Sequence, residues 1–462
     1  MFQLRDYQTD IIHQARELIK SGVKSILIQS PCGSGKTALT AHMIGAAASK
    51  GIPSFFIVHR RELLYQSAKT FDEVGIQHGF IASGFPADPR PLVQIASIQS
   101  LARRLDKVKT PKLIVWDECH RIACKSWSAV HAHYPDAIHI GLTATPCRLD
   151  GKGLGDWFAT LIRGPTVSAL ITQGYLSPYK AYAPTTISTE GLHTKMGDYV
   201  TNEIVKLVDK PTITGDVIAH YKRLAPGKRA LIFCASIKHS AHVVEQFNLA
   251  GIPAEHVDGE ADKSTRDAAM KRFQEGKTLI ISNVELFGEG LDIPSIEAVI
   301  LLRMTQSLGL ALQQIGRVLR PGIGKTAIIL DHVGNLQRHG LPDEDRKWSL
   351  SGREHNKSGK SQDAPVRTCP KCFAVMKAAM VRCKYCGHIF EVESREVLER
   401  EGELVEVDKE LLRRERMREQ GRVNGFEELV ALGKQRGYKH AYMWARNVMQ
   451  ARQAKQARRR QG

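Results

Sequence analysis

The chain has 462 residues and a formal net charge of +18, and both numbers limit what it can be. A chain of this length is long for one hydrophobic core, so we expect two or three domains. The sequence has no run of about 18 apolar residues, and its first residues, Met1 to Arg5, lack a signal-peptide pattern. We therefore expect a soluble, cytoplasmic protein without a membrane partner.

Five short apolar runs, alternating with helical patterns, predict a first α/β domain over residues 1–165. This alternation is typical of a parallel sheet flanked by helices. The predicted strands are residues 25–28, 54–58, 93–96, 113–116 and 138–142.

A phosphate-binding loop follows the first predicted strand, at residues 30–37 (SPCGSGKT). Its backbone N–H groups at Gly33, Ser34 and Gly35 can surround a polyphosphate, and Lys36 can reach the terminal phosphates. The Thr37 hydroxyl can hold Mg²⁺. The first glycine of the usual pattern is replaced by Ser30, so the match is one residue short of complete.

Two carboxylates follow the fourth predicted strand. Asp117 is placed to hold Mg²⁺ through water, and Glu118 to orient or deprotonate an attacking water. The alternative is an ordinary strand end with solvated acids, which the upstream loop makes the weaker interpretation.

A second alternating series predicts another α/β domain over residues 211–345. A less regular connecting segment, residues 166–210, precedes it, and a linker rich in Lys, Ser and Gly follows it at residues 346–364. The predicted strands are residues 230–233, 254–257, 278–282, 298–302 and 327–330.

Four of the nine cysteines form two C-x-x-C pairs ten residues apart, within a predicted zinc ribbon at residues 365–392. Four thiolates at this spacing suit a tetrahedral, structural Zn²⁺. A redox or disulfide role is the alternative. The predicted ligands are Cys369, Cys372, Cys383 and Cys386.

Residues 393–462 form a basic, mainly helical tail, with a strand-like run at 404–407 and helical patterns at 426–435 and 440–453. Residues 421–462 contain ten Lys or Arg against two acids, and residues 346–390 show the same excess. Such an excess favours a nucleic-acid partner, although a solvated tail is an alternative. The aromatic residues at 438–444 suit either stacking on bases or the core of a helical hairpin, and we favour the hairpin.

Residues 1–335 resemble the superfamily 2 helicases of the DEAD/DEAH type, because several motifs stand in that family's order. The resemblance implies two tandem RecA-like domains. It also implies that Gln8, in the Q motif at residues 4–8, reads the adenine of ATP. The other matching stretches are motifs Ia at 58–63, Ib at 97–100, III at 141–146, V at 282–292 and VI at 313–320.

Motif VI contains two arginines. The charge on the transferring phosphate must be stabilised by a cation, and an arginine from the second domain can do this when the cleft between the domains closes. We assign Arg320 as the arginine finger and Arg317 as a supporting phosphate contact. The implied reaction is ATP hydrolysis coupled to translocation along a strand or to unwinding.

The order of the modules is similar to RadD-like bacterial repair helicases and to related phage helicases. We therefore expect action on nucleic acid, DNA rather than RNA, in DNA repair. Protein partners can bind through the zinc ribbon or the tail. Two alternatives remain: a nucleic-acid-binding remodelling protein that uses ATP as a conformational switch, and the motor subunit of a restriction-type complex.

Overall fold

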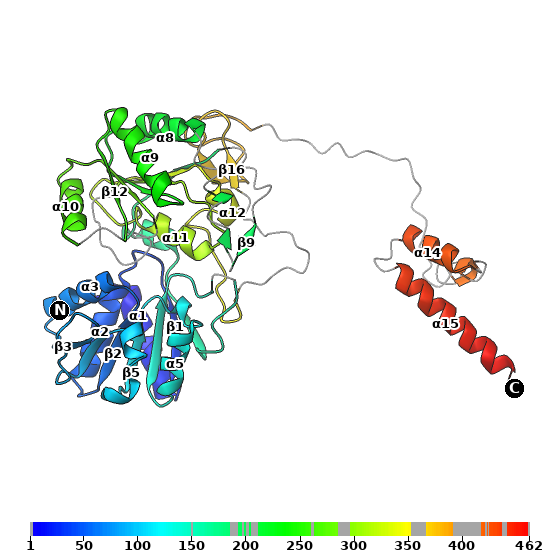
Figure 1. The fold of residues 1–462 in the computed structure, drawn as a ribbon, viewed down its shortest axis with the longest axis horizontal. Coiled ribbons are helices and arrows are strands. Elements are labelled where there is room, and N and C mark those ends of the chain that lie inside the picture. Colours follow the sequence, from blue (N-terminus) through cyan, green and yellow to red (C-terminus); the bar gives the residue numbers. More distant parts are fainter. Residues whose placement is uncertain are drawn as a thin grey trace. The chain divides into compact units, whose positions relative to one another are not determined.

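The structure is a computed structural model (Figure 1). It describes residues 3–148, 151–184, 193–195, 198–199, 203–204, 211–259, 263–284, 296–352, 366–390, 417–420, 423, 425–436 and 441–460. The chain divides into two compact units, residues 1–392 and 393–462.

A seven-stranded parallel sheet forms the first domain, in the order β3-β4-β2-β5-β6-β1-β7. All five predicted strands are present as β1, β2, β4, β5 and β6. The remaining two, β3 and β7, are the edges of the sheet. The bounds are β1 (Ser25–Gln29), β2 (Ser54–Val58), β3 (His78–Ile81), β4 (Val93–Ser97), β5 (Leu113–Trp116), β6 (Ile138–Thr143) and β7 (Thr160–Arg163).

Helices cover both faces of this sheet, which explains why its central strands are apolar throughout. Alternate side chains of one strand enter different cores: Phe56 lies in one and Phe55 in the other. The helices are α1 (Asp6–Lys20), α2 (Lys36–Ala48), α3 (Arg61–Glu73), α4 (Ile98–Leu101) and α5 (Lys125–His133), with 3₁₀ turns at Leu105–Lys107 and Cys119–Arg121.

A six-stranded parallel sheet forms the second domain, in the order β12-β13-β11-β14-β15-β8. Its edge strand β8 (Tyr179–Tyr182) comes from the predicted connecting segment. The other strands match the five predicted runs, with ends differing by up to two residues. They are β11 (Ala230–Phe233), β12 (Ala254–Val257), β13 (Ile280–Asn283), β14 (Ala298–Leu301) and β15 (Ala327–Asp331).

In the described part of the chain, helices and a small hairpin accompany this second sheet. The helices are α6 (Val167–Thr172), α8 (Pro211–Leu224), α9 (Ile237–Leu249), α10 (Lys263–Gln274), α11 (Leu308–Gly316) and α12 (Asn335–His339). The hairpin pairs β9 (Thr194–Lys195) with β10 (Asp198–Tyr199). Together the two sheets give the expected pair of tandem α/β domains.

The cysteine module is a short antiparallel hairpin of β16 (Val366–Thr368) and β17 (Val375–Lys377). It packs on β8 of the second domain, where Tyr182 pairs with Ala374 and the Ala183 amide donates to the Phe373 carbonyl. The module is therefore attached to the edge of the second sheet.

In the second unit, α14 (Phe426–Gln435) and α15 (Ala441–Arg460) form a helical hairpin. A Cβ on Gly433 would lie 3.0 Å from atoms of both Ala441 and Trp444, so the helices pack closely there. Trp444 thus belongs to the hairpin contact, as favoured from sequence. The strand-like run at 404–407 lies outside the described residues. Among the helices that the structure describes, none is long and apolar enough to cross a membrane.

Candidate functional site

The loop between β1 and α2 has the backbone of a phosphate-binding loop. Gly33 and Gly35 have φ angles of 80° and 81°, which side-chain-bearing residues rarely adopt. The Ser30 and Ser34 hydroxyls lie 2.7 Å apart, and Ser34 Oγ donates to the Pro31 carbonyl at 2.7 Å. Ser30, which replaces the usual glycine, therefore helps to close the loop.

Gln8 contacts this loop directly. Its side chain is 3% exposed, and Nε2 donates to the carbonyls of Ser34 and Gly35 at 3.2 Å each. Its Oε1 accepts from the Arg5 amide at 3.0 Å. The predicted Q motif thus lies against the phosphate loop. Recognition of adenine by Gln8 stays a prediction, and it requires Nε2 to exchange these carbonyls for the base.

Lys36 and Glu118 meet beside the loop. The distance from Lys36 Nζ to Glu118 Oε1 is 3.8 Å, and both side chains are about nine-tenths buried. Burial favours the neutral amine, but the carboxylates of Glu118 and Asp117 outweigh it, so the pKa of Lys36 is raised. A buried ammonium is therefore maintained where a nucleotide's terminal phosphates are expected.

Glu118 has an unusual backbone conformation, with φ 49° and ψ 48°. A non-glycine residue in this left-handed region carries about 1–3 kcal/mol of strain, and such strain is concentrated at functional sites. The conformation occurs at the turn after β5, where Asp117 N donates to the Ile57 carbonyl.

A chain of polar contacts leads from Glu118 to motif III. His120 Nδ1 lies 3.3 Å from Glu118 Oε2 and 3.2 Å from Thr143 Oγ1. Thr143 Oγ1 in turn donates to the Thr145 carbonyl at 3.1 Å. Thr145 Oγ1 lies 2.9 Å from where a Cβ on Gly309 of α11 would be. His120 was not singled out from sequence, although it follows the two carboxylates directly.

Motif VI packs against the phosphate loop from the second domain. A Cβ on Gly316, the last residue of α11, would lie 2.4 Å from Cys32 Cβ. A Cβ on Gly33 would lie 3.9 Å from Arg320 Cγ. Burial raises the pKa of the Cys32 thiol, while the positive charges of Lys36, Arg317 and Arg320 oppose the rise. The predicted arginines therefore lie at the loop, although residues 285–292 of motif V are outside the described part of the chain.

Two residues of the interdomain segment hold this arrangement and were missed from sequence. A Cβ on Gly33 would lie 2.8 Å from Leu176 Cδ2, so Leu176 covers the loop. Ser177 donates from its amide to the Leu319 carbonyl at 2.8 Å and from Oγ to the Arg320 carbonyl at 2.9 Å. Neither residue belongs to a recognisable motif, because their role depends on where the chain crosses between domains.

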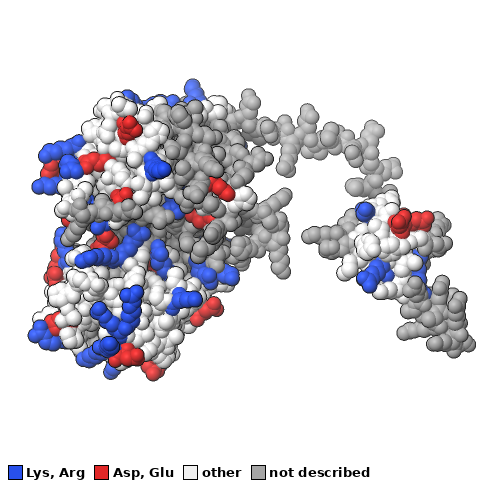
Figure 2. All heavy atoms as spheres, in the orientation of Figure 1, with Lys and Arg blue, Asp and Glu red and all other residues white. Residues whose placement is uncertain are grey.

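The stretches matched to motifs Ia and Ib lie on the first domain. Glu62, at the start of α3, pairs with Arg266 of α10 at 3.0 Å, which links the two domains. Gln99 Nε2 donates to the His59 carbonyl at 3.4 Å. Figure 2 shows Lys and Arg side chains over the visible face of both domains, with Asp and Glu among them. The charged side chains on this face do not by themselves mark one continuous path for a nucleic-acid strand.

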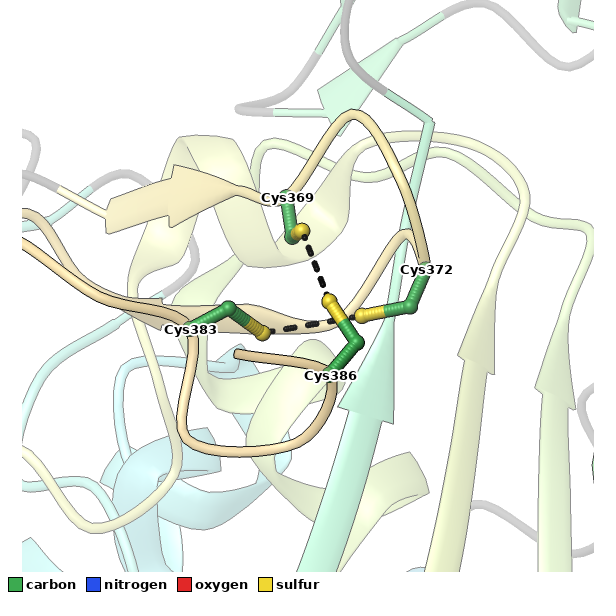
Figure 3. A group of neighbouring side chains, drawn as sticks. All are labelled: Cys369, Cys372, Cys383 and Cys386. Atoms are coloured by element: carbon green, nitrogen blue, oxygen red, sulfur yellow. Dashed lines mark hydrogen bonds between the residues drawn. The ribbon is translucent and has the colours of Figure 1, made fainter. Parts of the chain in front are cut away.

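The four predicted zinc ligands converge (Figure 3). All four sulfur atoms lie within 4.8 Å of one another, and the Cys369–Cys386 and Cys372–Cys383 pairs are both 3.6 Å apart. A tetrahedral zinc site with Zn–S bonds of about 2.3 Å requires sulfur atoms about 3.8 Å apart. Burial opposes ionisation of the thiols, but the amides of Cys386 and Tyr385 and the neighbouring thiols lower the pKa of Cys383, whereas burial and the same cluster raise the pKa of Cys372. The donor set therefore fits Zn²⁺.

Replacing Cys383 by serine is expected to remove bound zinc and to lower the unfolding temperature of the second domain, because the ribbon packs on β8. Metal analysis and thermal unfolding of the purified protein measure both effects. Cys124→Ser is the matched control, since Cys124 is exposed and lies outside the cluster. Full zinc content in Cys383→Ser would contradict the assignment.

Comparisons with known proteins show the family of this chain. Residues 1–148 match the family model of the type III restriction enzyme res subunit, and residues 210–322 match the helicase conserved C-terminal domain. A 51.5 kDa protein of a Lactococcus phage is 35% identical over 387 residues, which cover 83% of this chain and 82% of the phage protein. The chain belongs to the superfamily 2 helicases.

Two further relatives extend the comparison. IRC3 of Saccharomyces cerevisiae, which carries the name of an ATP-dependent helicase, is 27% identical over 72% of this helicase, and the match spans 51% of IRC3. The structure of LlaBIII, an ATP-dependent Type ISP restriction-modification enzyme bound to DNA, has a TM-score of 0.54 at 20% identity. That match covers 71% of this chain and 28% of LlaBIII, and it supports the fold.

The predicted fold class, family and enzyme class are thereby confirmed. This superfamily 2 helicase has two RecA-like domains and is an ATP hydrolase. A RadD-like identity, a role in DNA repair and a cytoplasmic location stay predictions.

Proposed function

We propose that this helicase is a DNA-dependent motor that hydrolyses ATP between its two RecA-like domains. One observation carries the proposal: Arg320 of the second domain lies beside Gly33 of the first, within the phosphate-binding loop. A nucleotide site shared by two domains makes their closure depend on ATP.

Each residue has a proposed role at this site. The loop amides from Gly33 to Gly35 and the Lys36 ammonium hold the phosphates, and Gln8 selects adenine. The Thr37 hydroxyl and, through water, the Asp117 carboxylate would hold Mg²⁺, which would neutralise phosphate charge. Glu118 orients or deprotonates the attacking water, while Arg320, supported by Arg317, neutralises charge on the transferring phosphate.

The polar chain from Glu118 through His120 and Thr143 to Thr145 is the proposed route from hydrolysis to movement. It begins at the catalytic carboxylate and ends against Gly309 of the second domain. A change at Glu118 during hydrolysis therefore alters contacts that both domains share. Cycles of closing and opening around a strand then give directional stepping.

We propose DNA as the track. LlaBIII, which shares the fold, has been solved bound to DNA. The two basic stretches, residues 346–390 and 421–462, provide the charge that a phosphate backbone attracts. We also propose that Zn²⁺ is a structural ion of the ribbon and that the ribbon or the tail binds partner proteins.

ATP hydrolysis measured with single-stranded DNA, duplex DNA, RNA or no nucleic acid tests the proposal. We expect DNA to raise kcat by about tenfold or more, since a motor couples turnover to its track. Stimulation by RNA alone would exclude DNA as the track. Equally slow turnover under all four conditions would exclude a nucleic-acid motor.

Two other functions share the same ATP site. A remodelling protein that uses ATP as a switch would hydrolyse ATP without separating strands, and a strand-displacement assay distinguishes it from an unwinding enzyme. The likeness to LlaBIII favours a third candidate, the motor of a restriction-type complex. That candidate requires DNA cleavage on addition of a nuclease subunit.

A further inference from the structure

Residues 340–352, here called the strap, connect the second domain back to the first. The strap begins after α12 and can be followed in Figure 1. Its beginning is fixed to the second domain: Leu341 lies in that domain's core, and the Tyr179 hydroxyl bonds to Asp343.

One arginine stabilises the fold of the strap. The Arg346 guanidinium donates to the carbonyls of His339 at 3.0 Å and Leu341 at 2.8 Å, and makes longer bonds to Pro342 and Glu344. A side chain that satisfies several carbonyls at once imposes a defined path on a segment without regular secondary structure.

The other end of the strap is attached to the first domain. The Gly155 amide donates to the Leu350 carbonyl at 3.0 Å, and Lys152 pairs with Gly352 in an antiparallel bridge. The Leu350 side chain packs against the core that contains Leu27 of β1. The strap therefore has an apolar anchor in each domain.

Between its anchors the strap lines a cavity that the phosphate-binding loop also lines. The cavity, of about 320 Å³, lies between the two domains. Its walls include Cys32 of the phosphate loop, Gly316 and Leu319 of motif VI, and strap residues from Pro342 to Trp348. The crossing segment at Arg163 to Val167 lines the same cavity. Both segments that connect the two domains, residues 163–167 and the strap, therefore line the cavity between the phosphate-binding loop and motif VI.

We propose that the strap is a tether that positions Arg320 at the phosphate loop, with Leu350 as its positioning residue on the first domain. This inference rests on the proposed ATPase cycle. A tether raises the effective concentration of one domain at the other, so closure no longer bears the full entropic cost of bringing them together. The strap therefore acts on the closing step that brings Arg320 to the phosphate, while ATP binding to the first domain proceeds without it.

Two substitutions, Gly153→Ala and Leu350→Asp, are designed to detach the strap from the first domain and lie outside the ATP site. They are called the lifted variants below. A Cβ in Gly153→Ala would lie 1.9 Å from the Leu350 carbonyl oxygen and 2.4 Å from the Gly352 nitrogen. Leu350→Asp places a charge against the apolar core of the first domain. Leu249→Asp is the matched control, because Leu249 is a 75% exposed leucine of the second domain. Leu350→Met retains the apolar contact and is expected to keep wild-type activity.

Kinetics, affinity for an ATP analogue and thermal stability are measured for each variant. We expect kcat to fall by about tenfold in both lifted variants, because small misplacements of a catalytic group are costly. Affinity for a non-hydrolysable ATP analogue should stay within about twofold, because the loop, Lys36 and Gln8 belong to the first domain. Adding Arg320→Ala to a lifted variant should cost less than Arg320→Ala costs alone, since both changes affect one contact.

Unchanged kcat in both lifted variants would overturn the proposal. So would parallel losses of kcat, analogue affinity and thermal stability, or a fully additive effect of Arg320→Ala, because each indicates a merely structural segment.

If DNA fails to stimulate the wild type, the motor proposal fails. Small-angle X-ray scattering of the analogue-bound protein then decides on the strap. A larger radius of gyration in the lifted variants supports the tether, and an unchanged radius rejects it.

Discussion

Glu118→Gln is expected to stop ATP hydrolysis while ATP still binds. The change keeps the size of the side chain but removes the carboxylate that orients or deprotonates water. Loss of such a group reduces kcat by about 10²–10⁴-fold. Lys36 keeps Asp117 as a neighbouring negative charge, so its ammonium remains available to the phosphates. Single-turnover hydrolysis and equilibrium binding of ATP measure the two effects separately.

Two further variants and the zinc content serve as comparisons for this prediction. Glu17→Gln changes an exposed carboxylate on α1 and is expected to leave turnover unchanged, since its side chain is 68% exposed. Lys36→Ala should lose both turnover and ATP binding, because it removes the cation that meets the phosphates. Zinc content should stay constant in all three variants. Near-normal kcat in Glu118→Gln would exclude Glu118 from the chemical step.

Arg320→Ala is expected to lower kcat by about 10³–10⁵-fold, the range measured for loss of an arginine finger. The structure places Arg320 beside Gly33 while its main-chain carbonyl is held by Ser177 and Lys325. The backbone contacts survive truncation to alanine, so the loss concerns the guanidinium alone. Steady-state turnover at saturating ATP measures it.

Arg320→Lys distinguishes charge from geometry. A lysine retains the positive charge but cannot make the forked, two-point contact of a guanidinium, so we expect partial activity. Arg272→Ala is the matched control, because Arg272 lies on α10 of the same domain and pairs with Glu255 at the surface. A small effect of Arg320→Ala, together with a large effect of Arg317→Ala, would reverse the assigned roles.

The interiors of both sheets could be predicted from sequence, whereas most of the edges could not. Central strands such as β1 and β5 are buried on both faces, so they read as uninterrupted apolar runs. The missed strands β3, β7 and β8 are all edge strands. Each has partly buried positions: β8, for example, has only Ala181 fully buried among its four residues. An edge strand whose side chains are buried on fewer sides does not need a run of apolar residues, so its sequence resembles that of a loop.

The convergence of the candidate ATP-site and zinc-site residues was also predictable, because phosphate, Mg²⁺ and zinc require particular residue types at particular spacings. Lys36, Glu118 and the four cysteines lie where those rules suggest. The supports of the site were not predictable. The Ser177 hydroxyl donates to the Arg320 carbonyl, and Leu350 packs on the first-domain core that contains Leu27, although 323 positions separate the two leucines in the sequence. Such contacts depend on the path of the folded chain, and no local pattern encodes them.

The docking of the cysteine hairpin on β8 has a consequence for solubility. An edge strand presents unpaired amide and carbonyl groups, and these can pair with the edge of another molecule. The Tyr182–Ala374 bridge and the Ala183–Phe373 hydrogen bond occupy part of the β8 edge. The hairpin thus shields the second sheet from edge-to-edge association. A fragment of this helicase that ends before Val366 would lose this shield. Aggregation of such a fragment would therefore result from the uncovered β8 edge and would carry no information about nucleic-acid binding.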